Sequence, residues 1–477
     1  MSKNIMVKLM DKKVLLLLII FFITNAFFNS QFQLHYDEAY YWAWSKNIQL
    51  SYFDHPPMIA YLIKLTTLFN DSEFFVRLPA LICTSITTLV VFKLALRMFD
   101  KQVANIAVIL ALAWPMLQGQ FFIVTPDSPL FMFWAMTLYF FYIGVLEEKP
   151  NYIYLAGISG GLALLSKYIA FLVFPGLFLF LLFSNKYRYY LLRKEIYIAF
   201  FLSILLFTPV IIWNFNHNWV SFLFQVKHGL DGGSVRVATF FDYLGSQILV
   251  FNPIISLPLI YYLIRYRKIN LNNDKLSFLL WPFLFVIIFF AFCSFFSYMG
   301  ANWTDAAYIS ALIINAYWIN YFNHRWIYIS SLTLMSVVFI IIKLPTIFLP
   351  PKLHERISAI NVFFGNQEML NEVKPYLKDD VVMLGCDYGT ASRGWYYLNK
   401  RVYVLNKFKY AHSYQYWNDG LNLPIKHAIF FCDVNDYKNI EILQQYFSKV
   451  ELINAPVFKN NISENKLYIF EAKNDIK

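Results

Sequence analysis

Long apolar stretches recur along most of this chain and constrain its fold more than any other feature. A membrane-spanning helix needs about 20 mostly apolar residues, and about eleven stretches approach this length. They lie near residues 13–29, 75–96, 103–122, 128–146, 152–166, 168–184, 196–213, 246–264, 277–296, 305–321 and 326–346. Hydrophobic residues make up 59% of the chain and charged residues only 14%. The sequence therefore predicts a mostly α-helical, polytopic membrane bundle.

The charges that flank these stretches predict how the chain crosses the membrane. Lysines precede the first stretch and no small-residue cleavage site follows it, so we interpret it as a retained signal anchor. Alternate connections between later stretches are mostly basic, which places them and the N-terminus in the cytoplasm. With an odd number of spans, the other connections and the tail face the periplasm. We expect a multi-pass protein of the cell inner membrane.

The formal net charge of +11 suggests nucleic acid at first sight. The basic residues, however, gather in short loops between apolar stretches and form no binding stripe. This placement is a topology signal, so we exclude nucleic acid as a partner.

Residues 347–477 differ in composition from the rest of the chain. Short apolar segments alternate with polar and helical ones, which predicts a soluble periplasmic α/β domain next to the transmembrane domain of residues 1–346. Cys386 and Cys432 lie in this tail, and the sequence leaves open whether they form a disulfide. The spacing of His and Cys residues fits no zinc site, so a divalent metal has no clear motif to support it.

The first periplasmic loop, residues 30–74, is the richest in reactive side chains. Asp37 and Glu38 follow the first apolar stretch, Tyr40 comes next, and Asp54 and His55 precede a rigid Pro-Pro pair. An acidic pair is not needed to anchor a helix in the interface, where aromatic residues suffice. The alternative is a solvated acidic pair beside an amphipathic helix.

Three charged residues lie at the outer ends of predicted spans. Arg77 and Asp127 are costly at membrane depth unless they face the bundle, although Arg77 can snorkel and Asp127 can cap a helix. Lys167 lies between two apolar stretches with almost no polar neighbours, against the positive-inside trend. A lone basic residue in such a place suits an anionic ligand such as phosphate, with snorkelling as the alternative.

A later periplasmic loop mixes amides, imidazoles and a lysine with aromatic residues, as sugar or phosphate recognition requires. Its candidates for substrate binding are His217, Trp219, Gln225, Lys227 and His228. The alternative is a hydrated loop with interfacial tryptophans. Residues 302–305 have a similar character and carry less weight. Together, carboxylates and basic groups on one face suit a reaction that needs an acid–base group and releases a phosphate.

Several of these segments, in this order and spacing, resemble the GT-C membrane glycosyltransferases. The resemblance covers about residues 30–320 and is strongest to the bacterial branch related to protein O-mannosyltransferases and to lipid A aminoarabinose and galacturonic acid transferases. The matching segments are Asp37-Glu38-Ala39-Tyr40-Tyr41, Tyr52-Phe53-Asp54-His55-Pro56-Pro57, Arg77-Leu78-Pro79, Thr125-Pro126-Asp127-Ser128-Pro129, Leu165-Ser166-Lys167-Tyr168 and His217-Asn218-Trp219 with Ser221-Phe222 and Gln225.

The resemblance implies an inverting transfer of a sugar from a polyprenyl (undecaprenyl) phosphate donor to a cell-envelope acceptor. The favoured acceptor is lipid A or another lipopolysaccharide component. It implies that Asp37 is the catalytic carboxylate and Asp127 the acid of the second loop, and that Lys167 and Arg77 hold the donor phosphate. Tyr168 falls in the matched segment around Lys167 and joins the substrate-binding candidates.

Two departures from the family pattern limit what is carried over. Asp54-His55 stands where the aminoarabinose branch shows Glu-Lys, which puts the contact of that lysine in doubt. Thr125-Pro126-Asp127 is a degenerate form of the Asp-x-Asp of metal-using relatives, so no metal is inferred.

Two other functions remain as alternatives. A protein O-glycosyltransferase would share the fold. A transporter or flippase of a polyprenyl-linked lipid would need polar groups deep within the spans and repeated halves, and the sequence shows neither.

Overall fold

The computed structural model describes residues 10–230, 235–344, 362–405, 412–417, 421, 425–433, 437–459 and 464–474. By internal packing the chain forms two compact units. The membrane unit comprises Met1–Phe27, Leu50–Ile59 and Arg77–Val338, and the loop–tail unit comprises Phe28–Gln49, Ala60–Val76 and Phe339–Lys477. Two parts of the first loop therefore pack with the tail. The division at residue 346 stays a prediction.

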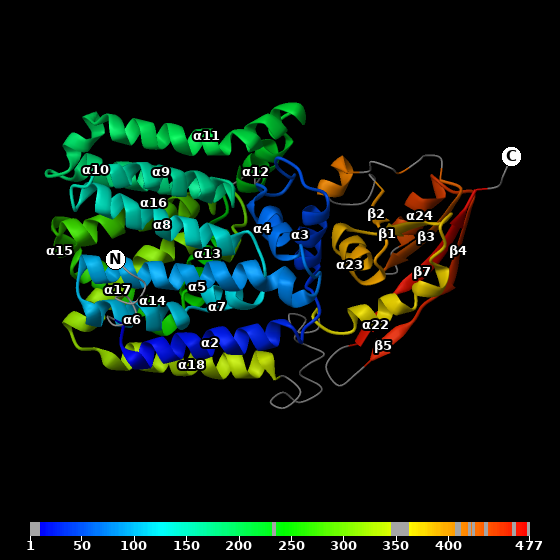
Figure 1. The fold of residues 1–477 in the computed structure, drawn as a ribbon, viewed down its shortest axis with the longest axis horizontal. Coiled ribbons are helices and arrows are strands. Elements are labelled where there is room, and N and C mark those ends of the chain that lie inside the picture. The colour runs from blue at the N-terminus through cyan, green and yellow to red at the C-terminus, as the bar shows by residue number, and fades with distance from the viewer. Residues whose placement is uncertain are drawn as a thin grey trace. The chain divides into compact units, whose positions relative to one another are not determined.

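Helices make up the membrane unit (Figure 1). Within the described residues, six are long and apolar enough to cross a membrane: α2 (Lys12–Asn29), α5 (Glu73–Met98), α8 (Asp127–Val145), α11 (Lys194–Asn216), α16 (Asp274–Cys293) and α18 (Arg325–Lys343). Two bent pairs raise the count to eight: α6 (Lys101–Leu112) with α7 (Pro115–Phe122), and α13 (Val237–Val250) with α14 (Pro253–Arg265). The mostly helical, multi-pass fold is confirmed.

The predicted count of about eleven spans exceeds these six to eight because several stretches are short or broken. α6 and α7 meet at 66° where Pro115 opens the second helix, and α13 and α14 meet at 112° before Pro253. The remaining three predicted stretches form helices shorter than a full span. They are α9 (Asn151–Leu164), α10 (Val173–Phe183) after the 3-10 helix η1 (Tyr168–Leu172), and α17 (Tyr308–Tyr321) after η3 (Ala301–Ala307). The apolar composition of a segment indicates that it lies in the bundle, but it does not give the length of the continuous helix that the segment forms.

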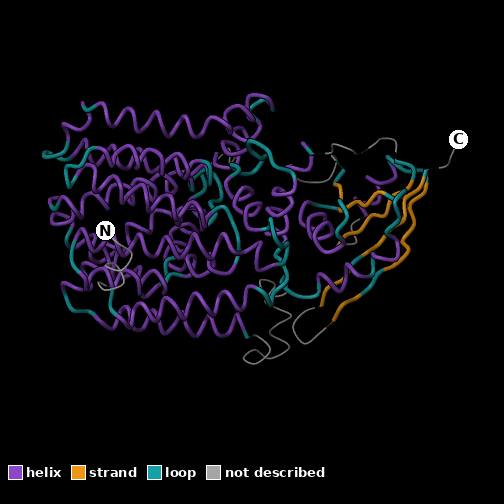
Figure 2. Tube along the Cα trace, in the orientation of Figure 1, coloured by secondary structure: helices purple, strands orange, loops and turns teal. Residues whose placement is uncertain are grey.

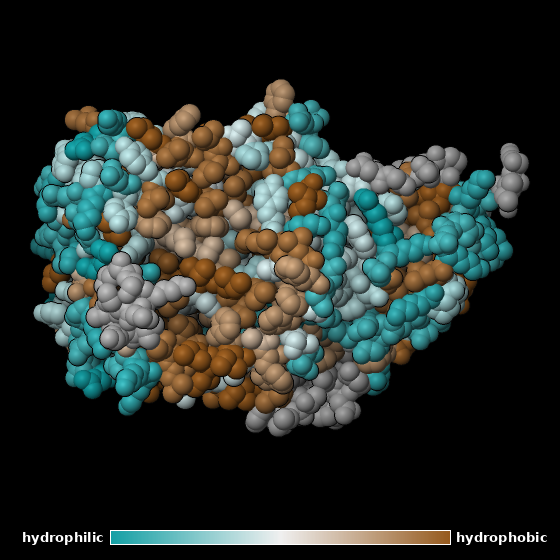
Figure 3. All heavy atoms as spheres, viewed as in Figure 1, coloured by the Kyte–Doolittle hydropathy of each residue, from teal (hydrophilic) through white to brown (hydrophobic). Residues whose placement is uncertain are grey.

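Short connecting helices complete the described part of this unit: α4 (Met58–Thr66, which continues into the loop–tail unit), η2 (Arg188–Leu192), α12 (Val220–Leu230) and α15 (Arg267–Asn272). On the face seen in Figure 3, hydrophobic residues predominate along the middle of the bundle, and hydrophilic ones gather at the end near α15. An apolar band of this kind is suited to contact with lipid.

Close backbone contact joins α9 to its neighbours α8 and α11, which lie beside it in Figure 1. A Cβ atom built at Gly157 of α9 would collide with the backbone of Ala199 in α11. Small residues at such crossings let membrane helices approach closely, because van der Waals packing replaces the hydrophobic effect there.

We expect Gly157→Ala to destabilise the membrane unit by about 1–3 kcal/mol, because α11 must move away to admit the methyl group. The measurement is the thermal unfolding midpoint of the purified protein in detergent. Gly119→Ala in α7 is the matched control, since its Cβ would meet no atom within 4 Å. Equal midpoints for the two variants would contradict this packing.

The loop–tail unit contains a mixed five-stranded sheet in the order β2-β1-β3-β7-β4 (Figure 2). β1 pairs in parallel with β2 and β3, and β7 runs antiparallel to β3 and β4. The strands are β1 (Val382–Gly385), β2 (Val402–Tyr403), β3 (His427–Cys432), β4 (Lys449–Asn454) and β7 (Tyr468–Lys473), with a separate hairpin of β5 (Val457–Lys459) and β6 (Glu464–Lys466). The predicted sheet-containing domain is confirmed.

The helical segments of this unit are α3 (Tyr36–Lys46), α22 (Asn366–Asn371), η4 (Lys374–Tyr376), α23 (Tyr388–Leu398), η5 (Ser413–Tyr416) and α24 (Tyr437–Gln444). α23 connects β1 to the parallel strand β2 and packs against α3 of the first loop.

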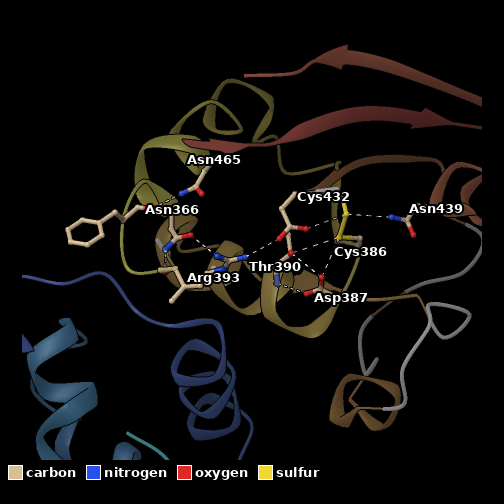
Figure 4. Close-up of polar contacts among 11 residues, drawn as sticks. Asn366, Cys386, Asp387, Thr390, Arg393, Cys432, Asn439 and Asn465 are labelled. Atoms are coloured by element: carbon tan, nitrogen blue, oxygen red, sulfur yellow. Dashed lines mark hydrogen bonds and ion pairs between the residues drawn. A yellow bond between two sulfur atoms is a disulfide. The ribbon is translucent and has the colours of Figure 1, made fainter. Parts of the chain in front are cut away.

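A disulfide closes the carboxyl ends of two neighbouring parallel strands. Cys386 directly follows β1 and Cys432 ends β3, and their sulfur atoms are 2.13 Å apart (Figure 4). The pairing that the sequence left open is therefore present.

Candidate functional site

A buried ion pair lies at the start of α8 in the membrane unit. Nζ of Lys167 is 2.7 Å from Oδ1 of Asp127, and the two side chains are only 8% and 6% exposed. Asp127 is the first residue of α8, directly after Pro126. Lys167 is the extended residue between α9 and η1, with φ −157°. Burying two charges is tolerable because each offsets the other.

Asp305 in η3 adds a second acid to this region. Its side chain is fully buried, and neither carboxylate oxygen has a hydrogen-bond partner among the described residues. η3 packs against α8, and the charges of Asp127 and Lys167 both act on Asp305. The sequence offered only one signal for this residue, an acid placed directly before an apolar stretch, and gave it little weight.

His55 completes the electrostatic group around Lys167. Burial, with a further contribution from the charge of Lys167, lowers the pKa of the imidazole to about 3. The ring is therefore neutral at physiological pH. α12 packs against the same segment, because Nε2 of Gln225 donates to the carbonyl oxygen of Asp54 at 3.0 Å. The structure thus links four predicted residues through an ion pair, an electrostatic interaction and the Asp54–His55 segment. They are His55, Asp127, Lys167 and Gln225.

Arg77 and Tyr168 are enclosed by aromatic residues. Arg77 is fully buried near the start of α5, and its guanidinium carbon lies 5.3 Å from the ring centroid of Phe122. Tyr168 follows Lys167 directly and meets Phe222 of α12 edge to face, with centroids 5.5 Å apart. Both stand where a predicted span reaches its outer end.

The other predicted residues of the later loop differ in their contacts and exposure. His217 stacks on Trp213 at a centroid distance of 4.0 Å and approaches its carbonyl oxygen through Nδ1 at 2.7 Å. Trp219 is 42% exposed, and Lys227 is exposed. The side chain of His228 lies outside the described residues. The predicted substrate-binding roles of these residues stay predictions.

Asp37 lies in the first turn of α3, in the loop–tail unit. His35 caps this helix, since its Nδ1 accepts from the backbone N–H of Asp37 at 3.2 Å. The hydroxyl of Tyr388 in α23 donates to Oδ1 of Asp37 at 3.1 Å. Burial raises the pKa of the Asp37 carboxyl to about 6, although the bond from Tyr388 acts in the opposite direction. A carboxyl group with such a pKa is suited to accept a proton near neutral pH.

Glu38 and Tyr40 are held in this unit by contacts of their own. Oε2 of Glu38 accepts from the backbone N–H of His35 at 2.9 Å, which completes a capping box. The hydroxyl of Tyr40 accepts from the backbone N–H of Ser413 at 2.7 Å, and its ring stacks on Tyr414. These contacts fix α3 against the tail. Their proposed role toward a substrate stays a prediction.

Among the described residues, one group brings three potential metal ligands together: Cys386, Cys432 and Asp433. Both cysteines form the disulfide, so they offer no thiolate. These residues therefore do not fit a metal ion in the oxidised protein.

The comparisons with known proteins agree on one fold. Residues 54–213 match the family of dolichyl-phosphate-mannose-protein mannosyltransferases. The lipid A galacturonosyltransferase RgtD of Rhizobium johnstonii is 28% identical over 322 residues, which are 65% of this chain and 66% of that protein. ArnT from Cupriavidus metallidurans in its apo state superposes with a TM-score of 0.66 at 13% identity, over 95% of this chain and 97% of that one. The chain therefore has the same fold as ArnT.

Two more structures share the fold of this chain. ArnT bound to undecaprenyl phosphate gives a TM-score of 0.65 at 14% identity, again over 95% of this chain and 97% of that one. The oligosaccharyltransferase of Archaeoglobus fulgidus gives 0.51 at 15% identity, over 87% of this chain and 67% of that one. The resemblance inferred from short sequence segments is therefore confirmed.

Breaking the buried pair between Lys167 and Asp127 should destabilise the protein strongly. We expect Lys167→Met to cost about 3–5 kcal/mol, because Asp127 is left buried without a partner. Adding Asp127→Asn should restore much of the loss. The measurement for both variants is thermal unfolding in detergent. Lys149→Met is the control, because the side chains of Lys149 and Glu147 are 55% and 23% exposed. Such an exposed ion pair should contribute no more than about 1 kcal/mol. A double variant no more stable than Lys167→Met would contradict the pairing.

The rate should also depend on the protonation of Asp37. Only the carboxylate accepts a proton, and the folded-state pKa is about 6, so kcat/KM should be constant above this pH and fall about tenfold per pH unit below it. The measurement is a pH–rate profile between pH 4.5 and 8. A profile without an acidic limb near pH 6 would contradict this role for Asp37.

Proposed function

We propose that this glycosyltransferase moves a sugar from a polyprenyl-phosphate donor to lipid A or another lipopolysaccharide component. The reaction takes place at the periplasmic face of the inner membrane. The observation that carries the proposal is the Asp37 carboxyl group, whose pKa burial raises to about 6. RgtD is named as a lipid A galacturonosyltransferase, and a structure of ArnT holds undecaprenyl phosphate. These relatives support the choice of donor and acceptor.

The proposed chemistry is an inverting displacement at the anomeric carbon. An acceptor hydroxyl attacks from the face opposite the phosphate, and Asp37 takes the hydroxyl proton as the new C–O bond forms. The bond between the anomeric carbon and the phosphate oxygen breaks, and its electron pair leaves with the polyprenyl phosphate. If the acceptor is a phosphate group, it is already anionic, and Asp37 orients it or the sugar instead.

Lys167 and Arg77 are the proposed partners of the donor phosphate. Both cations are buried in the membrane unit, where a charge interaction is stronger than in water. Asp127 holds the ammonium of Lys167 in place at 2.7 Å. Such preorganised cations offset the charge that develops on a leaving phosphate.

The proposal is tested with purified protein, lipid A and a panel of polyprenyl-phosphate sugars. We expect one donor to yield glycosylated lipid A together with free polyprenyl phosphate. Asp37→Asn should lower kcat at least about 100-fold, because the general base is lost. Asp71→Asn is the control in the same unit, since Asp71 is 49% exposed and pairs with Lys46.

Two results would overturn the proposal. Full activity of Asp37→Asn would remove the catalytic carboxylate. Sugar transfer to a protein, with none to lipid A, would favour the protein O-glycosyltransferase.

The proposed topology is tested separately. An alkaline phosphatase fused to the C-terminus should be active, and an inactive fusion would place the tail in the cytoplasm.

A further inference from the structure

Two neighbouring features fix the position of Tyr388 at the start of α23. Asp387 caps this helix, because its Oδ1 accepts from the backbone N–H of Thr390 at 2.7 Å. The residue before the cap is Cys386, whose disulfide to Cys432 ties the end of β1 to the end of β3 (Figure 4). The first turn of α23 is therefore anchored both by the cap and by a covalent bond.

This anchored turn lies directly against α3. A Cβ atom built at Gly389 would lie 2.9 Å from Cβ of Tyr36, so the two helices approach closely there. The ring of Tyr388 packs against that of Tyr40, with centroids 4.5 Å apart. With the ring fixed in this way, its hydroxyl reaches Oδ1 of Asp37 at 3.1 Å.

We propose that Tyr388 of the tail domain is a positioning residue for the catalytic carboxylate of Asp37. Its hydroxyl holds one carboxylate oxygen and thereby leaves the other to meet the acceptor. The same bond favours the charged form of Asp37, which is the form that accepts a proton. The tail domain is then a part of the catalytic apparatus. This inference rests on the proposed role of Asp37.

Other groups near Asp37 also influence its protonation. On its own segment these are His35, whose Nδ1 is 3.6 Å from Oδ2 of Asp37, and Glu38, whose charge raises the pKa of Asp37. From α23, Tyr388 is the direct partner, while Asp387 and Arg393 act on the adjacent Tyr36. The hydrogen bond from the Tyr388 hydroxyl lowers the pKa of Asp37, because it stabilises the carboxylate.

The test is the pH dependence of kcat/KM in Tyr388→Phe, which keeps the ring and removes only the hydroxyl. Loss of a hydrogen bond to a charged group should lower kcat/KM about 10-fold near pH 6.5. The acidic limb should move to higher pH, because the carboxylate loses its stabilising donor, and the rate should partly recover in more alkaline buffer. A merely structural role would lower the rate at all pH values and leave the limb in place.

Tyr396→Phe is the matched control on the same helix. Its hydroxyl donates to the carbonyl oxygen of Asp71 at 2.6 Å and so also joins α23 to the first loop. This variant should keep the wild-type limb. Should Tyr388→Phe fold poorly, incorporation of a fluorinated tyrosine at position 388 tests the same bond, since its more acidic phenol is a stronger donor and should move the limb to lower pH.

The outcomes separate this inference from the proposed function. If Asp37→Asn is inactive and Tyr388→Phe shows the wild-type limb, the positioning role is wrong and the catalytic role of Asp37 stands. If Asp37→Asn is fully active, the proposed function fails before Tyr388 is considered. A limb that moves only in Tyr388→Phe supports the inference.

Discussion

The buried ion pair between Lys167 and Asp127 is the interaction on which the membrane unit depends where α8 begins. Both side chains are buried, and each charge offsets the cost of burying the other. Their pairing requires the start of α8 and the turn after α9 to meet within hydrogen-bond distance. His55 and Asp305 then feel the same charges, so one electrostatic requirement organises side chains from four separate segments.

The environment of the Asp37 carboxyl group in the loop–tail unit differs from that of Asp127. Within the described part of the chain, no lysine or arginine pairs with Asp37 as Lys167 pairs with Asp127, and burial raises the pKa of the Asp37 carboxyl group. A hydroxyl and a helix cap contact it instead. This environment leaves the carboxylate basic, which a proton acceptor needs and a charge-paired acid does not offer.

The outcome for individual residues shows where sequence reasoning succeeds and why it stops. Lys167 was recognised because a basic residue between two apolar stretches is costly without a partner. Its partner Asp127 was recognised only as a separate candidate, since 40 residues separate them. Asp305 was undervalued because nothing in the local sequence reveals that its helix packs on α8. Tyr388 was missed for the same reason, because it contacts a residue 351 positions away.

The sequence by itself determined that this chain is a multi-pass helical membrane protein with a sheet-containing tail, and it pointed to the GT-C fold through short ordered segments. These properties follow from local composition and spacing, which are readable along the chain. Only the tertiary structure decided that several apolar stretches bend or stop short of a full span. The breaks at Pro115 and Pro253 change the direction of the helix axis but leave the hydrophobicity of the stretch unchanged. It also decided which charges pair and which hydroxyl meets Asp37, because such contacts depend on distances in space that sequence separation does not encode.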